Sequence, residues 1–131
     1  MKIEIRRVKK TIIDIDRLEK LATLDPQKGR PLSVEIYKRD GNEAYLRCMK
    51  SLKLGLGILK EILDQYHSAL FKDLPLDVYL KPITIVVNGY GTFTKIKFKG
   101  TDTTIKAAEV FERIRKLKSV GLVVHTIEEN N

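Results

Sequence analysis

The longest apolar pattern in this chain covers residues 42–71 and limits the choice of fold more than any other feature. Its apolar residues recur every three or four positions, which is the spacing of one helix face. They are Tyr45, Cys48, Met49, Leu52, Leu56, Leu59, Ile62, Leu63, Tyr66 and Leu70. A second set widens the stripe: Leu46, Leu54, Ile58 and Ala69. The pattern predicts one long helix that packs on two sides.

A helix of about 28 residues is about 42 Å long at about 1.5 Å per residue, more than the sheet of a small domain covers. Soluble monomers rarely expose so large an apolar band, and we therefore expect a homodimer in which this helix meets its own copy about a two-fold axis. The predicted interface is Leu52, Gly55, Leu56, Gly57, Leu59 and Leu63. The alternatives are that the first helix covers the band or that the long helix breaks at Gly57.

Shorter patterns predict the other elements. Alternation typical of half-buried strands occurs at residues 2–10, 32–36, 83–87, 92–99 and 120–127, and helical spacing recurs at 14–24 and 102–117. Side chains that can accept hydrogen bonds from a helix's first N–H groups precede the helices: Asp14 or Asp16, Asn42 and Asp102. We expect these residues to be N-caps.

The order of these elements predicts an α+β protein. Residues 31–127 follow the βαββαβ order of a ferredoxin-like, split βαβ sheet, and residues 1–30 add an N-terminal strand and helix. A plain α+β arrangement is the alternative. Since no repeat or internal linker is visible, we expect a single domain over residues 1–131.

The chain has 43% hydrophobic residues, enough for a packed core, and a formal net charge of +8 that favours anionic partners. Its single cysteine, Cys48, excludes an intrachain disulfide and a thiolate metal cluster. No signal segment or run of about 18 apolar residues is visible. We expect a soluble, cytoplasmic protein with no cofactor, no metal site and no membrane contact.

The composition is rich in Ile, Leu, Lys and Glu, poor in Gln and devoid of Trp, a bias found in hyperthermophile proteins. In composition the whole chain resembles the small uncharacterised proteins of hyperthermophilic archaea and their viruses. This resemblance implies no site residues.

The strand at 92–99 suggests a binding surface. Period-two alternation separates Ile96 and Phe98 from a set on the opposite face: Phe93, Lys95, Lys97 and Lys99. Sheet surfaces bind single-stranded nucleic acid by stacking bases on aromatic rings and neutralising phosphates. The alternative is that these lysines protect an exposed strand from edge-to-edge aggregation.

Residues 88–93 read Asn-Gly-Tyr-Gly-Thr-Phe and resemble the Gly-aromatic-Gly-aromatic core of the RNA recognition motif. They depart from it at Asn88, where a basic residue is expected, and at Thr92, where an aromatic is expected. Lys95 also replaces an apolar or aromatic residue of that motif, and the helix at 42–71 is far longer than in that family.

The leading functional hypothesis is a small protein that binds DNA or RNA without strong sequence specificity. The residues assigned to binding are Arg6, Arg7, Lys9, Lys10, Tyr90, Phe93, Lys95, Lys97 and Lys99. The second hypothesis is a homodimeric protein-interaction module with no nucleic-acid role. A further basic set is expected on the solvated face of the last helix, with pairs such as Glu109 and Arg113: Lys106, Arg113, Arg115, Lys116 and Lys118.

Enzyme motifs are weak. Gly55 and Gly57 lack the third glycine of a dinucleotide fingerprint and lie inside a helix. His67 and His125 are the only histidines, and neither has a neighbour in sequence that would complete a metal site. A nuclease with His125 as general base is the third hypothesis. The sequence assigns no catalytic residue.

Overall fold

The computed structural model describes residues 3–25, 30–31, 37–89 and 91–130, and for residues 3–10, 24–25, 30–31 and 124–130 it describes the backbone. The helices are α1 (Ile15–Ala22), α3 (Asn42–Gln65), α4 (His67–Phe71), α5 (Leu76–Tyr79) and α6 (Ala107–Arg115). The strands are β1 (Ile3–Ile12), β2 (Leu24–Asp25), β3 (Arg30–Pro31), β4 (Ile83–Val87), β5 (Phe93–Phe98), β6 (Thr104–Lys106) and β7 (Gly121–Asn130).

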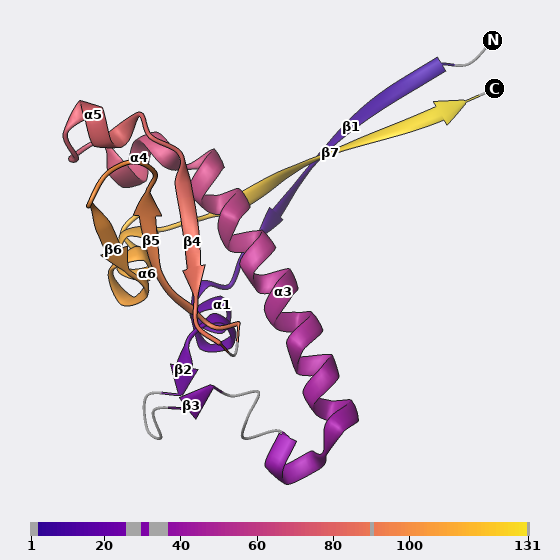
Figure 1. The fold of residues 1–131 in the computed structure, drawn as a ribbon. Coiled ribbons are helices and arrows are strands. Elements are labelled where there is room, and N and C mark those ends of the chain that lie inside the picture. The colour runs from indigo at the N-terminus through magenta and orange to yellow at the C-terminus, as the bar shows by residue number, and fades with distance from the viewer. Residues whose placement is uncertain (1–2, 26–29, 32–36, 90, 131) are drawn as a thin grey trace.

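The described strands form antiparallel sheets beside these helices, which confirms the α+β class. β4, β5 and β6 make a three-stranded sheet with β5 in the middle. β1 pairs with β7 in a two-stranded ribbon, and β2 pairs with β3. Figure 1 shows the β1–β7 ribbon extending away from the three-stranded sheet, with the long helix α3 crossing the molecule between them.

The ferredoxin-like order is not confirmed. It requires the strand predicted at 32–36 beside β5, and those residues lie outside the described part of the chain. Among the described strands, β5 has two neighbours, β4 and β6, and β7 pairs with β1 in a separate sheet. The prediction that a helix begins at Asp102 is wrong, because Ile105 is buried between two exposed neighbours and continues the sheet as β6. α6 begins only at Ala107.

The core lies between the inner face of the three-stranded sheet, α6 and the C-terminal half of α3. Its largest fully buried side chains are Phe71, Phe98, Phe111, Leu59, Ile62, Leu63, Ile96, Ile114 and Val110. The rings of Phe71 and Phe98 meet edge to face, with centroids 5.4 Å apart. Each such apolar side chain stabilises the fold by about 1.5–3 kcal/mol relative to exposure, so this cluster fixes α3 and α6 against the sheet.

The helix α3 is one continuous helix of 24 residues. It passes Gly57 without a break and ends at Gln65, because Tyr66 leaves the helical conformation before α4 begins. The Tyr66 hydroxyl donates to the backbone oxygen of Gly121 at 2.8 Å and accepts from the nitrogen of Gly121 at 2.9 Å. The predicted helix at 42–71 is therefore two helices, and the junction between them is fastened to β7.

Much of the band of α3 that was expected to face a second copy is covered within the chain: Leu59 and Leu63 belong to the core, and α1 lies over Gly55. A Cβ atom built on Gly55 would lie 3.5 Å from side-chain atoms of Leu18 and Leu21. The predicted interface is therefore wrong for its buried members, which are Leu52, Gly55, Leu59 and Leu63. Leu56 is half-buried against the core, whereas Gly57 is exposed. The homodimer itself stays a prediction.

Two of the cap predictions have clear outcomes. The Asp14 carboxylate accepts a hydrogen bond from the Arg17 backbone nitrogen at 3.2 Å, so Asp14, one of the two predicted candidates, is the N-cap of α1. Asn42 is instead the first residue of α3, and the N-cap position belongs to Gly41. Gly41 has a φ of 89°, a conformation that favours glycine.

Candidate nucleic-acid interface

The outer face of the three-stranded sheet carries an array of lysines. Alternation along β5 buries Ile96 and Phe98 and exposes Lys95 and Lys97, as predicted from the sequence. β6 adds Lys106, which was expected on the last helix. The register of β5 and β6 places Lys106 directly opposite Lys95. We call Lys95, Lys97 and Lys106 the lysine face.

The register of the sheet arranges the lysine face in two rows. The first row across the strands is Val86, Lys95 and Lys106, and the second is Thr84, Lys97 and Thr104. Neighbouring strands lie about 4.8 Å apart, and residues two apart on a strand are separated by about 6.8 Å. The three lysines therefore start from adjacent points of one surface, with threonine hydroxyls beside them.

No carboxylate of the described residues lies within 4 Å of an ammonium group of the lysine face. Lys99, which follows β5, is also exposed and has no such partner there. Like charges directly opposite each other on a sheet are destabilising, by about 0.2–1 kcal/mol. The lysine face is thus a positive surface that the described part of the fold leaves unneutralised.

Phe93 does not belong to this surface, contrary to its predicted position beside Lys95. Its side chain is only 2% exposed and packs edge to face against Phe111, with ring centroids 6.0 Å apart. The register of β4 and β5 shifts between Val86 and Val87, opposite Thr94. This irregularity turns Phe93 to the core side, so a base cannot stack on it. Tyr90, the other predicted stacking residue, lies outside the described residues.

The N-terminal basic run lies in a different part of the molecule. Arg6, Arg7, Lys9 and Lys10 all fall within β1, where their register partners on β7 are Ile127, Thr126, Val124 and Val123. Because β1 runs away from the three-stranded sheet (Figure 1), this run and the lysine face do not form one continuous site.

Arg113 and Arg115, two of the basic residues expected on the solvated face of the last helix, instead form ion pairs within the fold. Arg113 donates to both carboxylate oxygens of Asp73, at 2.7 and 3.1 Å, and to the backbone oxygen of Leu70 at 2.7 Å. Its guanidinium carbon also lies 5.9 Å from the centroid of the Phe71 ring. The hydrogen bond from Arg113 lowers the pKa of Asp73, and the same bond raises the pKa of Arg113.

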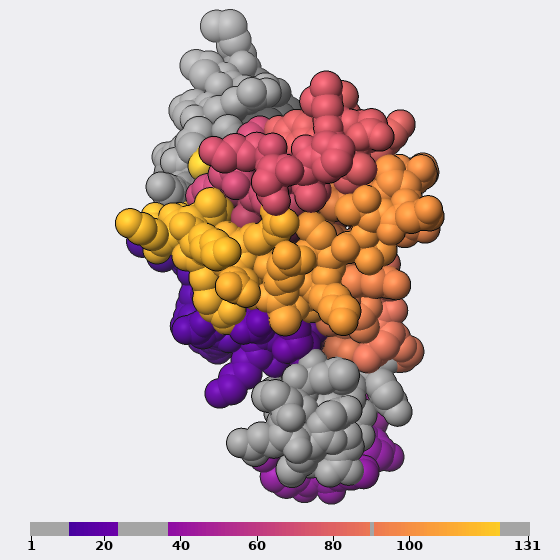
Figure 2. Space-filling model, turned by 90° about the vertical axis from the view of Figure 1, so that its left-hand side faces the viewer, coloured from indigo at the N-terminus to yellow at the C-terminus, as the bar shows by residue number. Residues whose placement is uncertain are grey.

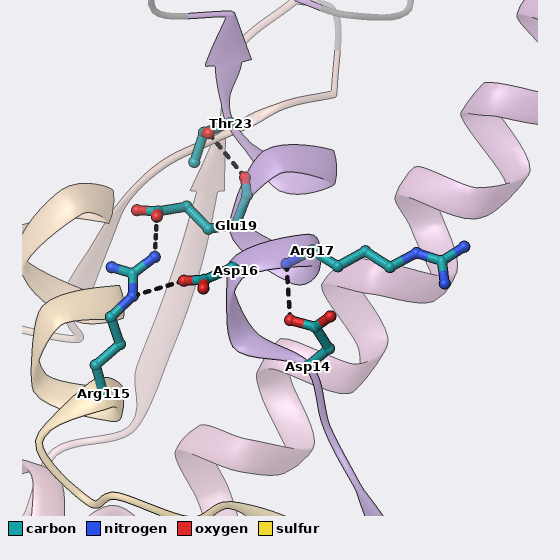
Figure 3. A network of polar contacts seen from close by, with 6 residues as sticks. All are labelled: Asp14, Asp16, Arg17, Glu19, Thr23 and Arg115. Atoms are coloured by element: carbon teal, nitrogen blue, oxygen red, sulfur yellow. Dashed lines mark hydrogen bonds and ion pairs between the residues drawn. The ribbon is translucent and has the colours of Figure 1, made fainter.

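Arg115 joins α6 to α1. Its guanidinium donates to Asp16 at 3.0 Å and to Glu19, and Figure 3 shows both acidic side chains reaching toward it from α1. These hydrogen bonds, first of all the one to Glu19, raise the pKa of Arg115. In Figure 2, α6 and the segments around it (orange to yellow) fill the surface above α1 (indigo). Asp16 is therefore a tie between helices, whereas Asp14 is the cap.

Sequence reasoning missed a third group of cations. Arg47, Lys50 and Lys53 are exposed on the N-terminal half of α3, and none of them has a carboxylate within 4 Å in the described part of the chain. The apolar pattern of residues 42–71 drew attention to the buried stripe of this helix. The three cations lie at the polar positions of the same helix, between the apolar residues of that stripe.

The histidines form no catalytic cluster among the described residues. The His67 ring lies 5.4 Å from that of Phe71 and 4.6 Å from that of Tyr79, so it packs as part of an aromatic group. His125 lies in β7 opposite Val8. Within the described ranges no three His, Cys, Asp or Glu side chains converge on a site for a metal ion. The nuclease hypothesis stays a prediction.

None of the helices described here combines the length and apolar composition that a membrane span requires. Comparisons of the chain with protein-family models, with curated proteins and with solved structures find no match.

Proposed function

We propose that this protein binds DNA or RNA through the phosphate backbone at the lysine face, without strong sequence specificity. The observation that carries the proposal is the exposure of Lys95, Lys97 and Lys106 on adjacent strands with no acidic partner in the described part of the chain. Their attachment points are separated by no more than about one Debye length, which is about 8 Å at physiological ionic strength. They therefore act on a polyanion as one positive surface.

The neighbouring groups also suit a phosphate backbone. Thr84 and Thr104 lie on either side of Lys97, and hydroxyl side chains commonly donate to phosphate oxygens. A phosphate held between Lys95 and Lys106 would relieve the repulsion between their ammonium groups. In this proposal Lys99 extends the surface and Tyr90 stays a candidate stacking residue, while Arg6, Arg7, Lys9 and Lys10 offer a second contact on β1.

Fluorescence anisotropy with labelled single-stranded and duplex DNA and RNA tests the proposal. Each phosphate contact contributes about 0.9 to the slope of log affinity against log salt for duplex DNA and about 0.7 for single strands. We expect the triple substitution Lys95→Gln, Lys97→Gln and Lys106→Gln to lower that slope by about 2 to 3. It should weaken binding to all sequences about equally, because phosphates carry no sequence information.

The matched control removes the same charge elsewhere, with Lys20→Gln, Lys72→Gln and Lys81→Gln, all exposed positions outside the sheet. It should keep most of the affinity. If neither the native chain nor the control binds any of these nucleic acids at low salt, the proposal is wrong. Equal losses in the two triple variants would show that net charge, and not the lysine face, drives binding.

A further inference from the structure

The hydrogen-bond pattern of the β1–β7 ribbon defines which backbone groups point outward. The nitrogen of Ile13 donates to the oxygen of Val120 at 3.2 Å, at the end of the ladder that continues as Ile12 opposite Gly121. Pairs that exchange hydrogen bonds alternate with pairs that do not. Odd-numbered residues of β1 therefore bond to even-numbered residues of β7. The odd-numbered residues of β7 direct their N–H and C=O groups away from β1.

Two side chains of the helix junction occupy the start of that outer edge. The Gln65 amide accepts from the nitrogen of Val123 at 3.1 Å and donates to its oxygen at 3.2 Å, as a neighbouring strand would. Tyr66 bonds to both backbone groups of Gly121 in the same way. The next outward positions are His125, Ile127 and Glu129. Within the described residues, β1 is the only strand that pairs with β7.

The two edges of the ribbon differ in charge. β1 contains Arg6, Arg7, Lys9 and Lys10, and cations on an edge strand oppose pairing with another strand. β7 contains no lysine or arginine between Gly121 and Asn130. The edge of β7 is therefore the one open to a further strand, and a two-stranded ribbon by itself is only marginally stable in water.

We propose that the edge of β7 pairs antiparallel with the same edge of a second copy of this chain. With Ile127 on the two-fold axis, Ile127 lies opposite Ile127 of the second copy and His125 lies opposite its Glu129. The facing residues are thus apolar with apolar and a histidine with a carboxylate, which makes the edge complementary to itself. This pairing forms about six backbone hydrogen bonds, two at each bonded pair.

Neighbouring registers are less favourable. A shift that brings Val123 into the pairing is blocked, because Gln65 already occupies the backbone groups of Val123. A shift the other way places Ile127 opposite Glu129 of the second copy, an apolar side chain opposite a carboxylate. The chosen register builds a four-stranded sheet in the order β1–β7–β7–β1, with the cationic strands outermost. Isologous pairing of this kind closes at two copies. The inference does not depend on nucleic-acid binding.

Sedimentation velocity of the full chain from micromolar to millimolar concentration tests the pairing. We expect a species of twice the chain mass of 15.0 kDa. The substitution Ile127→Pro removes an outward N–H without removing a β1–β7 hydrogen bond, and it should raise the dissociation constant about tenfold or more. The control Val8→Pro makes the same change on the outer edge of β1 and should leave the dimer intact.

A cross-link tests the register independently of any effect of proline on folding. Bonded antiparallel pairs have Cα atoms about 5.5 Å apart, within the range of a disulfide. In a Cys48→Ser background, Ile127→Cys should oxidise to a covalent dimer and Val124→Cys should not. A chain that is monomeric at every concentration would overturn the proposal. So would a dimer that survives Ile127→Pro or that cross-links at residue 124 and not at residue 127.

Discussion

The arginines of α6 and the lysines of the three-stranded sheet lie on the same molecule and are used in opposite ways. Arg113 and Arg115 each bind carboxylates that are distant in sequence, and through them α6 is tied to Asp73, Asp16 and Glu19. The lysine face has no carboxylate within 4 Å in the part of the chain that the structure describes. One set of cations is neutralised within the fold, and the other is exposed without an acidic partner among the described residues.

The chemistry of the two side chains fits this division. A guanidinium is a planar fork that binds a carboxylate with two parallel hydrogen bonds, which fixes the geometry of both partners. An ammonium on a flexible stem is a point charge that contacts phosphates without one required orientation. The type of cation, together with its nearest acid, therefore distinguishes the cations that tie the fold together from those available for the proposed binding better than net charge does.

The largest effect that tests this comparison is the loss of Arg113. Arg113→Ala removes the donors to Asp73 and to the backbone oxygen of Leu70, as well as the contact with the Phe71 ring. Hydrogen bonds that involve a charged group typically contribute about 1.5–3 kcal/mol, and we expect the free energy of unfolding to fall by about that amount. Chemical denaturation followed by circular dichroism measures it.

Lys97→Ala is the matched control for Arg113→Ala, since it deletes a cation without a described partner. Its effect on the free energy of unfolding should stay within about 0.5 kcal/mol, as for most surface substitutions. Nucleic-acid affinity should respond in the reverse order, with Lys97→Ala weakening it more than Arg113→Ala. If the two variants were equally destabilised, the division between structural and functional cations would be wrong.

A smaller effect of opposite sign is expected at Lys106. Lys106→Glu places a carboxylate opposite Lys95, which replaces a repulsive cross-strand pair by an attractive one. Such pairs are worth about 0.2–1 kcal/mol, so the free energy of unfolding should rise while nucleic-acid affinity falls. Lys106→Gln removes the repulsion alone and should give a smaller rise. A destabilised Lys106→Glu variant would mean that Lys106 has a structural partner.

Local patterns predicted the elements of this chain better than their arrangement. Alternation located β4 and β5, and helical spacing located the course of α3. The N-cap role of Asp14 also follows from local chemistry, because a carboxylate accepts hydrogen bonds from the next turn. The lysines of β5 were identified for the same reason, since period-two alternation applies wherever a strand is regular.

The predictions that failed concern contacts between segments that are distant in the sequence. The cover of Gly55 on α3 by α1 depends on Leu18 and Leu21, and no local pattern contains that contact. The register shift between Val86 and Val87 defeats period-two alternation and buries Phe93. The addition of β6 to the sheet brings Lys106 to Lys95, and no feature of either segment alone predicts that pairing.

The smallest effect concerns the pH dependence of the tie between Asp73 and Arg113. The hydrogen bond from Arg113 holds the pKa of Asp73 below its ordinary value. A carboxyl group with a lowered pKa in the folded state stabilises the fold above its unfolded-state pKa, about 3.9 for aspartate. That stabilisation is lost as the pH falls through the lowered folded-state pKa. Since Asp73 is largely exposed, solvent and salt screen the effect.

Denaturation of the native chain and of Asp73→Asn between neutral pH and about pH 2 measures this contribution. The stability difference between them should be constant above about pH 5 and shrink toward zero at lower pH. In an Arg113→Ala background, Asp73→Asn should have a much smaller pH-dependent effect, because the main cause of the lowered pKa is gone. A difference that stays constant to the lowest pH would show that Asp73 contributes through packing and that its charge is not needed.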